Sequence, residues 1–209
     1  EQVERVRELL ATVGLGADAL QRYPSEFSGG QRQRIGVARA LSLNPRLVIA
    51  DEPVSALDVS VQSQVLNLMV QLQRERGLAY VFISHDLSVV EHVSDVVAIM
   101  YLGRIVEMGP VRAIFDRPAH PYTRALMQAI PSGNPRQRRA SVPLTGEAPS
   151  PMATLPGCAF ASRCPYALDA CRQAVPPLEP VTAAATDAQP HVAACIRRDE
   201  IDTLATAAG

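Results

Sequence analysis

The chain has 209 residues, of which 47% are hydrophobic, and this supports a buried core in one large domain or in a domain with an appendage. Its formal net charge of −1 argues against a nucleic-acid-binding surface as the main function, because neutralising a phosphate backbone needs a clustered positive excess. No stretch reaches the length of a membrane-spanning helix without a charge or a proline, and no signal peptide precedes the first predicted helix, so we expect a soluble, cytosolic chain.

Two helices are predicted in the first part of the chain. Residues 1–13 place their apolar side chains on one face at helical spacing, as in an amphipathic helix. A second helix begins after Ser28, a residue type that caps helix N-termini. Gly29 and Gly30 allow backbone N–H groups to approach an anion closely, and the positive end of the helix dipole points to the same place. The segment from Ser28 to Gln31 therefore predicts a helix N-terminus that binds phosphate.

A short apolar run at 47–50 predicts a strand that ends in two carboxylates. The run lies between two prolines and is apolar throughout, which is typical of a buried strand. Asp51 and Glu52 follow at its C-terminal end, and in an open α/β sheet that edge is where ligands bind. A segment Ser-Ala-Leu-Asp, which ends at Asp58, then leads into the next helix.

The next two elements complete a βαβ unit. A long helix is predicted over 59–76, and a strand rich in β-branched and aromatic residues over 79–84. The two strands are therefore expected to be parallel and joined by a right-handed crossover. His85 follows the second strand directly, so we expect it at the same sheet edge as Asp51 and Glu52.

A hairpin and two helices are predicted next. Short strands at 96–102 and 104–108 meet at Gly103, as in a terminal β-hairpin. A short helix is expected over 110–117, and Pro121 suits the first turn of another helix. These elements bring the chain to a region of different composition.

Residues 130–157 are rich in Pro, Ser, Gly and Arg, a composition typical of a linker. The three clustered arginines of this segment, Arg136, Arg138 and Arg139, are expected to stay hydrated, with acidic lipid headgroups as the alternative partner. The last residues, 199–209, are small and polar and are expected to be frayed.

All four cysteines lie in the tail, at Cys158, Cys164, Cys171 and Cys195. Zinc sites usually contain a closely spaced cysteine pair, which this tail lacks, and disulfides are disfavoured in the cytosol. Four thiolates are the number that a 4Fe–4S cluster needs. We therefore expect a cluster that stabilises this loop-rich tail, with zinc as one alternative and thiols or disulfides without a metal as the other.

The motifs above, in this order, resemble the C-terminal half of an ABC-transporter ATPase domain. The segment His120-Pro121-Tyr122-Thr123-Arg124-Ala125-Leu126 is similar to the tail of the branch that handles dipeptides, oligopeptides, nickel and glutathione. The cysteine tail resembles the tail of the same branch, where the four cysteines are read as cluster ligands. The resemblance covers essentially the whole chain. It implies an α/β fold, a partial P-loop NTPase (ABC ATPase) domain with a parallel sheet and helices, plus a small irregular cysteine-rich C-terminal extension.

The resemblance also implies a division of the chain. Residues 1–110 would be the C-terminal part of the ATPase domain, 111–157 a helical connector and linker, 158–198 the cysteine-rich tail and 199–209 a flexible tail. All 20 basic residues are Arg, so the Lys of the phosphate loop G-x-x-x-x-G-K-S/T is not in the chain. We therefore expect a fragment that, on its own, neither binds ATP tightly nor hydrolyses it.

The mechanism of the family gives each motif a role in this chain. Asp51 is expected to hold Mg²⁺, Glu52 to orient or deprotonate the attacking water, and His85 to hydrogen-bond the γ-phosphate. The residues expected to contact ATP held by a second ATPase domain, or to lie across that shared interface, are Ser28, Gly29, Gly30, Gln31 and Asp58.

The resemblance implies an ATP-hydrolysing motor subunit of an importer for peptides. Its partners would be a second ABC ATPase domain, two transmembrane permease subunits and, indirectly, an extracytoplasmic substrate-binding protein, at the cytoplasmic face of the inner membrane and without nucleic acid. The alternative is an ABC-type ATPase that acts on nucleic acid or ribosomes, but such proteins are expected to carry long coiled coils or basic arms, which this chain lacks. A third hypothesis, a metal-binding regulatory module alone, requires the ATPase motifs to be inert.

Overall fold

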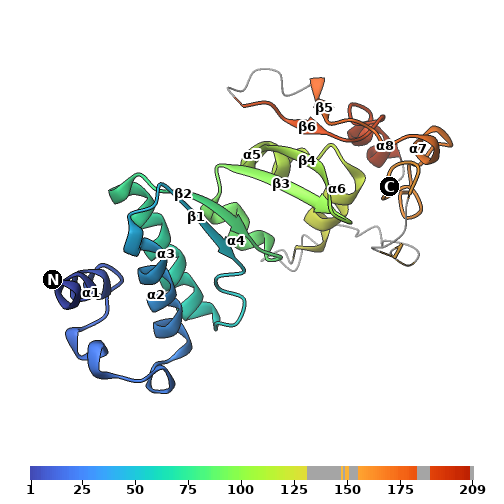
Figure 1. The fold of residues 1–209 in the computed structure, drawn as a ribbon. Coiled ribbons are helices and arrows are strands. Elements are labelled where there is room, and N and C mark those ends of the chain that lie inside the picture. The colour runs from blue at the N-terminus through green and yellow to red at the C-terminus, as the bar shows by residue number, and fades with distance from the viewer. Residues whose placement is uncertain (131–146, 148, 151–154, 183–188, 208–209) are drawn as a thin grey trace. The chain divides into compact units, whose positions relative to one another are not determined.

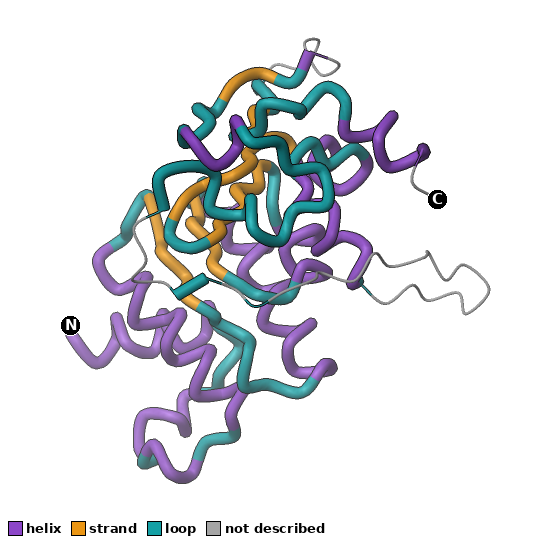
Figure 2. The backbone as a smooth tube through the Cα atoms, turned by 90° about the vertical axis from the view of Figure 1, so that its right-hand side faces the viewer, coloured by secondary structure: helices purple, strands orange, loops and turns teal. Residues whose placement is uncertain are grey.

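The computed structural model describes residues 1–130, 147, 149–150, 155–182 and 189–207. The chain divides into two compact units, residues 1–93 and 94–209, and each is described by itself (Figure 1; Figure 2). The predicted linker lies almost wholly outside the described residues, and so do Arg136, Arg138 and Arg139.

Helices dominate the first unit. They are α1 (Gln2–Thr12), η1 (Ala17–Gln21), η2 (Pro24–Glu26), α2 (Gly29–Ala40), η3 (Leu41–Leu43), α3 (Val59–Arg76) and α4 (Leu87–Val93). The predicted helices near 1–13, after Ser28 and over 59–76 are confirmed, whereas the sequence patterns did not indicate α4. A buried cluster that includes Val13, Leu41 and Leu72 joins α1, η3 and α3, because each helix turns an apolar stripe to the others.

The sheet of the first unit has two described strands, β1 (Leu47–Asp51) and β2 (Ala79–Ile83). They are parallel, with Leu47 opposite Ala79 and Asp51 opposite Ile83, as the βαβ prediction requires. Because the strands are parallel and pair residue by residue without a shift, both bring their C-terminal residues to the same edge of the sheet. That edge positions the motif residues discussed below.

Only one face of this sheet is covered by described residues, so the prediction of a fully buried strand is wrong for the chain as it stands. Ala50, Tyr80 and Phe82 pack against helix residues on the covered face. On the other face Ile49 is 68% exposed, and Leu47, Val81 and Ile83 are exposed with it. The alternation follows from the period of two in a strand, and no described element lies over the second face.

The second unit is built on a four-stranded antiparallel sheet in the order β3-β4-β6-β5. Its strands are β3 (Val96–Tyr101), β4 (Arg104–Pro110), β5 (Glu179–Pro180) and β6 (Val192–Ala193). The predicted hairpin is confirmed, and its turn has Leu102 at φ 45° and Gly103 at φ 75°, the two positive values of a type I′ turn. The prediction that this hairpin ends the sheet is wrong, because β6 from the tail pairs with β4.

Four helices are described in the second unit, α5 (Val111–Asp116), α6 (Pro121–Ala129), α7 (Ala170–Gln173) and α8 (Ile201–Ala207). The first two match the predicted helices. The prediction of a frayed tail is wrong for α8. Ile201 is 1% exposed, and the Asp202 carboxylate lies 2.7 Å from the Arg124 guanidinium. Among the described residues, none of the helices is both long enough and apolar enough to cross a membrane.

Candidate functional site

The N-terminus of α2 forms a capping box. The Ser28 hydroxyl accepts a hydrogen bond from the Gln31 N–H (3.3 Å), and the Gln31 side-chain oxygen accepts one from the Ser28 N–H (3.0 Å). The N–H groups of Gly29 and Gly30 lie in the first turn, where the helix itself offers no acceptor. Their contact with an anion stays a prediction.

Gly30 has a second reason to be glycine. A Cβ atom at this position would lie 2.3 Å from Cγ1 of Val61 on α3, too close for any real side chain. The absence of a side chain thus lets α2 approach α3. The sequence pattern indicated only the phosphate contact, since the packing partner is 31 residues away.

The two strand ends bring Glu52 and His85 together. The Glu52 N–H donates to the Ile83 carbonyl (2.9 Å), which continues the ladder one residue beyond β1. The Glu52 carboxylate then lies 3.0 Å from Nδ1 of His85, and both side chains are exposed. Glu52 has φ 44°, in the left-handed region that non-glycine residues rarely adopt, and such strained residues are concentrated at functional sites.

Asp51 and Asp58 lie close to Glu52 in sequence, one before it and one after it. Asp51 is exposed at the last position of β1, opposite Ile83. Asp58 caps α3, because its carboxylate accepts hydrogen bonds from the Ser60 hydroxyl (2.7 Å) and the Val61 N–H (3.0 Å). These bonds, that from Ser60 first, lower the pKa of Asp58.

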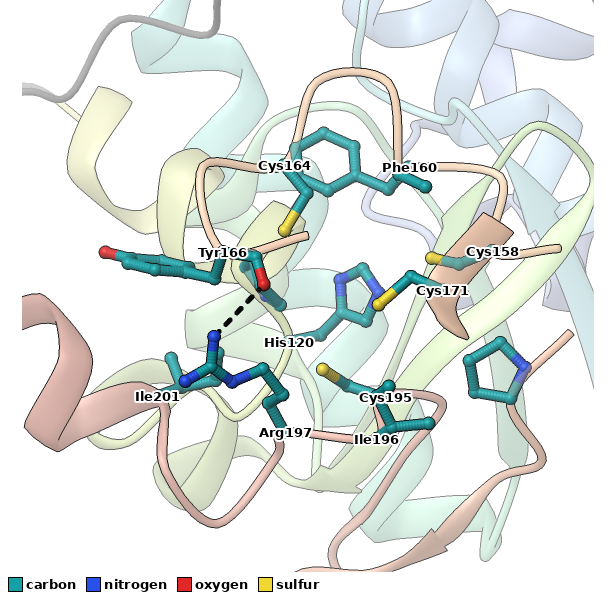
Figure 3. Close-up of a pocket in the computed structure, with 13 residues that line it drawn as sticks. His120, Cys158, Phe160, Cys164, Tyr166, Cys171, Cys195, Ile196, Arg197 and Ile201 are labelled. Carbon is teal, nitrogen blue, oxygen red and sulfur yellow. Dashed lines mark hydrogen bonds between the residues drawn. The ribbon is translucent and has the colours of Figure 1, made fainter. Parts of the chain in front are cut away.

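The four cysteines line one pocket in the second unit (Figure 3), together with side chains that include His120, Phe160 and Arg197. All four are free thiols. Cys158 and Cys171 are held side by side, since the N–H of Cys158 donates to the carbonyl of Cys171 (2.7 Å). Within the described ranges, however, no group of three or more His, Cys, Asp or Glu side chains is gathered closely enough to hold a metal ion.

Burial and backbone N–H groups act on these thiols in opposite directions. Burial raises the pKa of Cys164 and of Cys195 to about 11, and it also raises the pKa of Cys158. The backbone N–H groups two residues after these cysteines, at Phe160, Tyr166 and Arg197, oppose the shift by stabilising the thiolate. Cys171 accepts a hydrogen bond from the Leu168 N–H (3.4 Å). Every sulfur therefore has an N–H group that favours negative charge.

A buried carboxylate that the sequence patterns did not reveal lies beside this pocket. Glu107 on β4 is fully buried, and its oxygens accept from the N–H groups of Ala119 (2.7 Å) and His120 (2.9 Å). One of them also lies 2.7 Å from Nε2 of His191. His191, which has no predicted role in phosphate binding, thus pairs with a buried charge. The sequence offered one signal for this buried carboxylate, a Glu within a predicted strand. It gave no indication of the partner 84 residues away.

Models of known protein families match a segment of each unit. A family model described as "ABC transporter" matches residues 1–55, and one described as "Oligopeptide/dipeptide transporter, C-terminal region" matches residues 106–171. The dipeptide transport ATP-binding protein DppF of Haemophilus influenzae is 58% identical over 86% of this chain and 55% of its own length. Both units are therefore similar to ATP-binding proteins of oligopeptide/dipeptide ABC transporters.

Two further relatives give the same result. DppF of Escherichia coli is 58% identical over 84% of this chain and 53% of its own length, and the oligopeptide transport protein AppF of Bacillus subtilis is 56% identical over 84% and 54%. The chain thus spans about half the length of the curated relatives that it matches.

Solved structures support the ABC ATPase fold. A metal-chelate type ABC transporter in an inward-facing conformation is 27% identical, with a TM-score of 0.53 over 59% of this chain and 47% of its own. The ATP-binding cassette MJ1267 in its ADP conformation is 23% identical, with a TM-score of 0.53 over 62% of this chain and 51% of its own. The predicted α/β ABC ATPase fold is therefore confirmed, whereas these comparisons do not address a cysteine-rich extension.

Proposed function

We propose that the full-length protein is the ATP-hydrolysing subunit of an ABC importer for peptides. The observation that carries this proposal is the pairing of Glu52 with His85 at the C-terminal edge of a parallel sheet, 3.0 Å apart, in a chain similar to these transport proteins. The names of the relatives refer to dipeptide and oligopeptide transport, and they lend no support to the alternative of an ATPase that acts on nucleic acid or ribosomes.

The residues at this edge suit the hydrolysis of a phosphoanhydride, which depends on positioning and charge neutralisation. Asp51 offers exposed carboxylate oxygens, the ligands that Mg²⁺ prefers, and Mg²⁺ would neutralise charge on the phosphates when it is bound. Glu52 would orient the attacking water and accept its proton. Because Nδ1 of His85 faces the Glu52 carboxylate, the imidazole donates its proton there and holds the carboxylate in one orientation.

The remaining partners follow from the family. We propose that ATP binds between this protein and a second ATPase domain, with the N-terminus of α2 facing the phosphates of the partner's nucleotide. The 209 residues contain no Lys, so the phosphate loop would belong to the part of the relatives that the chain does not cover. Two permease subunits, an extracytoplasmic binding protein and a place at the cytoplasmic face of the inner membrane complete the proposal.

Transport-coupled hydrolysis tests this function. The full-length protein, with its partner ATPase and permeases, is reconstituted in lipid vesicles, and phosphate release is measured with and without a binding protein loaded with di- or oligopeptides. We expect peptide-dependent stimulation. Stimulation by DNA or ribosomes without any response to peptide would show that the alternative is correct.

For the cysteine pocket we propose a 4Fe–4S cluster, with zinc as the alternative. Four free thiols in one pocket, each with a backbone N–H that favours thiolate, support a metal–thiolate centre. The thiols would lose their protons on binding the metal. Protein purified without oxygen is expected to be brown, with four iron and four sulfide per chain. A colourless preparation with one zinc per chain would establish zinc instead.

A further inference from the structure

His120 lies at the cysteine pocket and belongs to no role described so far. Its side chain is among those that line the pocket, and in the view of Figure 3 its imidazole appears between the labelled cysteine side chains. The residue is only 1% exposed. Each of the two ring nitrogen atoms can take part in a hydrogen bond.

The contacts of His120 fix which nitrogen carries the proton. Nδ1 accepts a hydrogen bond from the Tyr122 N–H (3.1 Å), so that His120 caps α6. An acceptor nitrogen has no proton, and the neutral imidazole must therefore be protonated at Nε2.

Surrounding groups hold the ring in this place. Glu107 accepts a hydrogen bond from the backbone N–H of His120 (2.9 Å), and the ring packs on Phe160, with their centroids 5.9 Å apart. In the part of the chain that the structure describes, no atom accepts a hydrogen bond from Nε2. Arg197, another polar side chain at the pocket, is already engaged with Glu200 and with the Tyr166 carbonyl.

We infer that His120 is the side-chain hydrogen-bond donor of the cysteine pocket, whose Nε2–H stabilises the negative charge of the sulfur atoms once a metal centre has formed there. This inference rests on the proposed cluster. Hydrogen bonds to sulfur tune the reduction potential of such centres, and groups that support the ligands change metal affinity about 10–100-fold. His120 is a positioning residue here and not a ligand, since the four thiols already satisfy the ligand count.

Two substitutions separate this donor from the capping role. His120→Asn keeps an acceptor close to the position of Nδ1, because Asn is a good N-cap, but it removes the donor from the pocket. His120→Gln places an amide N–H near the position of Nε2 and loses the cap. Both variants are made in the full-length protein, purified without oxygen, and compared with the unsubstituted protein for iron content, midpoint potential and loss of iron to a chelator.

We expect His120→Asn to hold iron about 10–100-fold more weakly and to have a lower midpoint potential, and His120→Gln to resemble the unsubstituted protein in both. If His120→Asn keeps its iron and its potential, or if only His120→Gln is weakened, the donor role is wrong and the cluster proposal stands. If the unsubstituted protein holds zinc and no iron, the cluster is wrong, and the zinc affinities of the same two variants decide the role of His120. If it holds neither metal, both proposals are overturned.

Discussion

The two units of this chain place their polar functional groups in opposite environments. In the first unit Glu52 and His85 are exposed at a sheet edge, and few other contacts hold them. In the second unit Glu107, His120 and His191 are buried and joined by hydrogen bonds shorter than 3 Å through the Glu107 carboxylate. Exposed groups are free to meet a ligand and contribute little to folding, whereas buried charges are tied to the stability of the unit that surrounds them.

The apolar surfaces of the two units differ in the same way. The sheet of the first unit leaves Leu47, Ile49, Val81 and Ile83 without a described cover, so its edge depends on further protein to exclude water. In the second unit the tail covers its own hairpin, and Phe160 packs edge-on against Tyr101, with centroids 5.4 Å apart. The described residues thus leave an apolar sheet face of the first unit open, whereas the tail covers the hairpin of the second.

Glu52→Gln should give the largest effect and should affect activity alone. The amide keeps the shape of the carboxylate but cannot take up a proton, so we expect ATP turnover of the full-length protein to fall about 10²–10⁴-fold, with nucleotide binding intact. Because Glu52 is half exposed, the free energy of unfolding should change by less than about 0.5 kcal/mol. Phosphate release and thermal unfolding are measured together. Turnover near that of the unsubstituted protein would show that Glu52 is not the general base.

Glu107→Ala should show the opposite pattern. It leaves His191 and two buried N–H groups without their acceptor, so we expect the second unit to lose about 3–5 kcal/mol of stability. Hydrogen exchange of the second unit in the full-length protein measures this loss. Glu200→Ala is the matched control, because its exposed ion pair with Arg197 should contribute less than about 1 kcal/mol. Equal effects of the two substitutions would contradict the contrast between the units.

Gly157→Ala tests how tightly the cysteine segment is packed. A Cβ at this position would lie 2.3 Å from the Cys171 carbonyl oxygen, a backbone atom that cannot move aside cheaply, so we expect a loss of about 1–3 kcal/mol. Gly36→Ala is the control, since nothing lies within 4 Å of the new methyl group and alanine favours the helix. Denaturant unfolding should show Gly36→Ala to be neutral or stabilising by about 0.5–1 kcal/mol. A harmless Gly157→Ala would mean that the segment is loosely held.

Asp58→Ala gives the smallest expected effect. Asp58 is an exception in the first unit, because it is an exposed motif residue that also contributes to folding. This exposed motif residue also caps α3, so its removal should slightly lower the denaturant midpoint of the first unit. Asp58→Asn keeps a capping oxygen and should restore that stability. Chemical denaturation compares the two variants. If both are as stable as the parent protein, the cap has no structural importance and the two units differ still more sharply.

Local signals predicted the parts of the fold that depend on neighbours in sequence. The helix at 59–76 was predicted with its observed bounds, because its apolar spacing, the cap at Asp58 and the stop at Gly77 all act within one helix. The proximity of Glu52 and His85 followed from the parallel strands. Both are consequences of periodicity and of the βαβ rule.

The elements that escaped prediction depend on distant contacts. β5 and β6 have two residues each, too few to show an alternation, and they form only because β4 offers a free edge. α8 was missed since its small residues carry a weak apolar pattern, although Ile201 packs in the core. The pairing of Glu107 with His191 left no local trace, because each residue by itself resembles an ordinary charged position.

The long separation between the partners of Glu107 has a consequence during synthesis. Glu107 and His191 are 84 residues apart, and Arg124 and Asp202 are 78 apart. At about 5–20 residues per second, a ribosome needs roughly 4–17 s to make His191 after Glu107. During that interval the carboxylate has no histidine, and the outer edge of β4 is open to pairing with other strands. The nascent hairpin is therefore most exposed to aggregation and to chaperones before residues 191–193 emerge, and a chain cut before His191 would keep that vulnerability permanently.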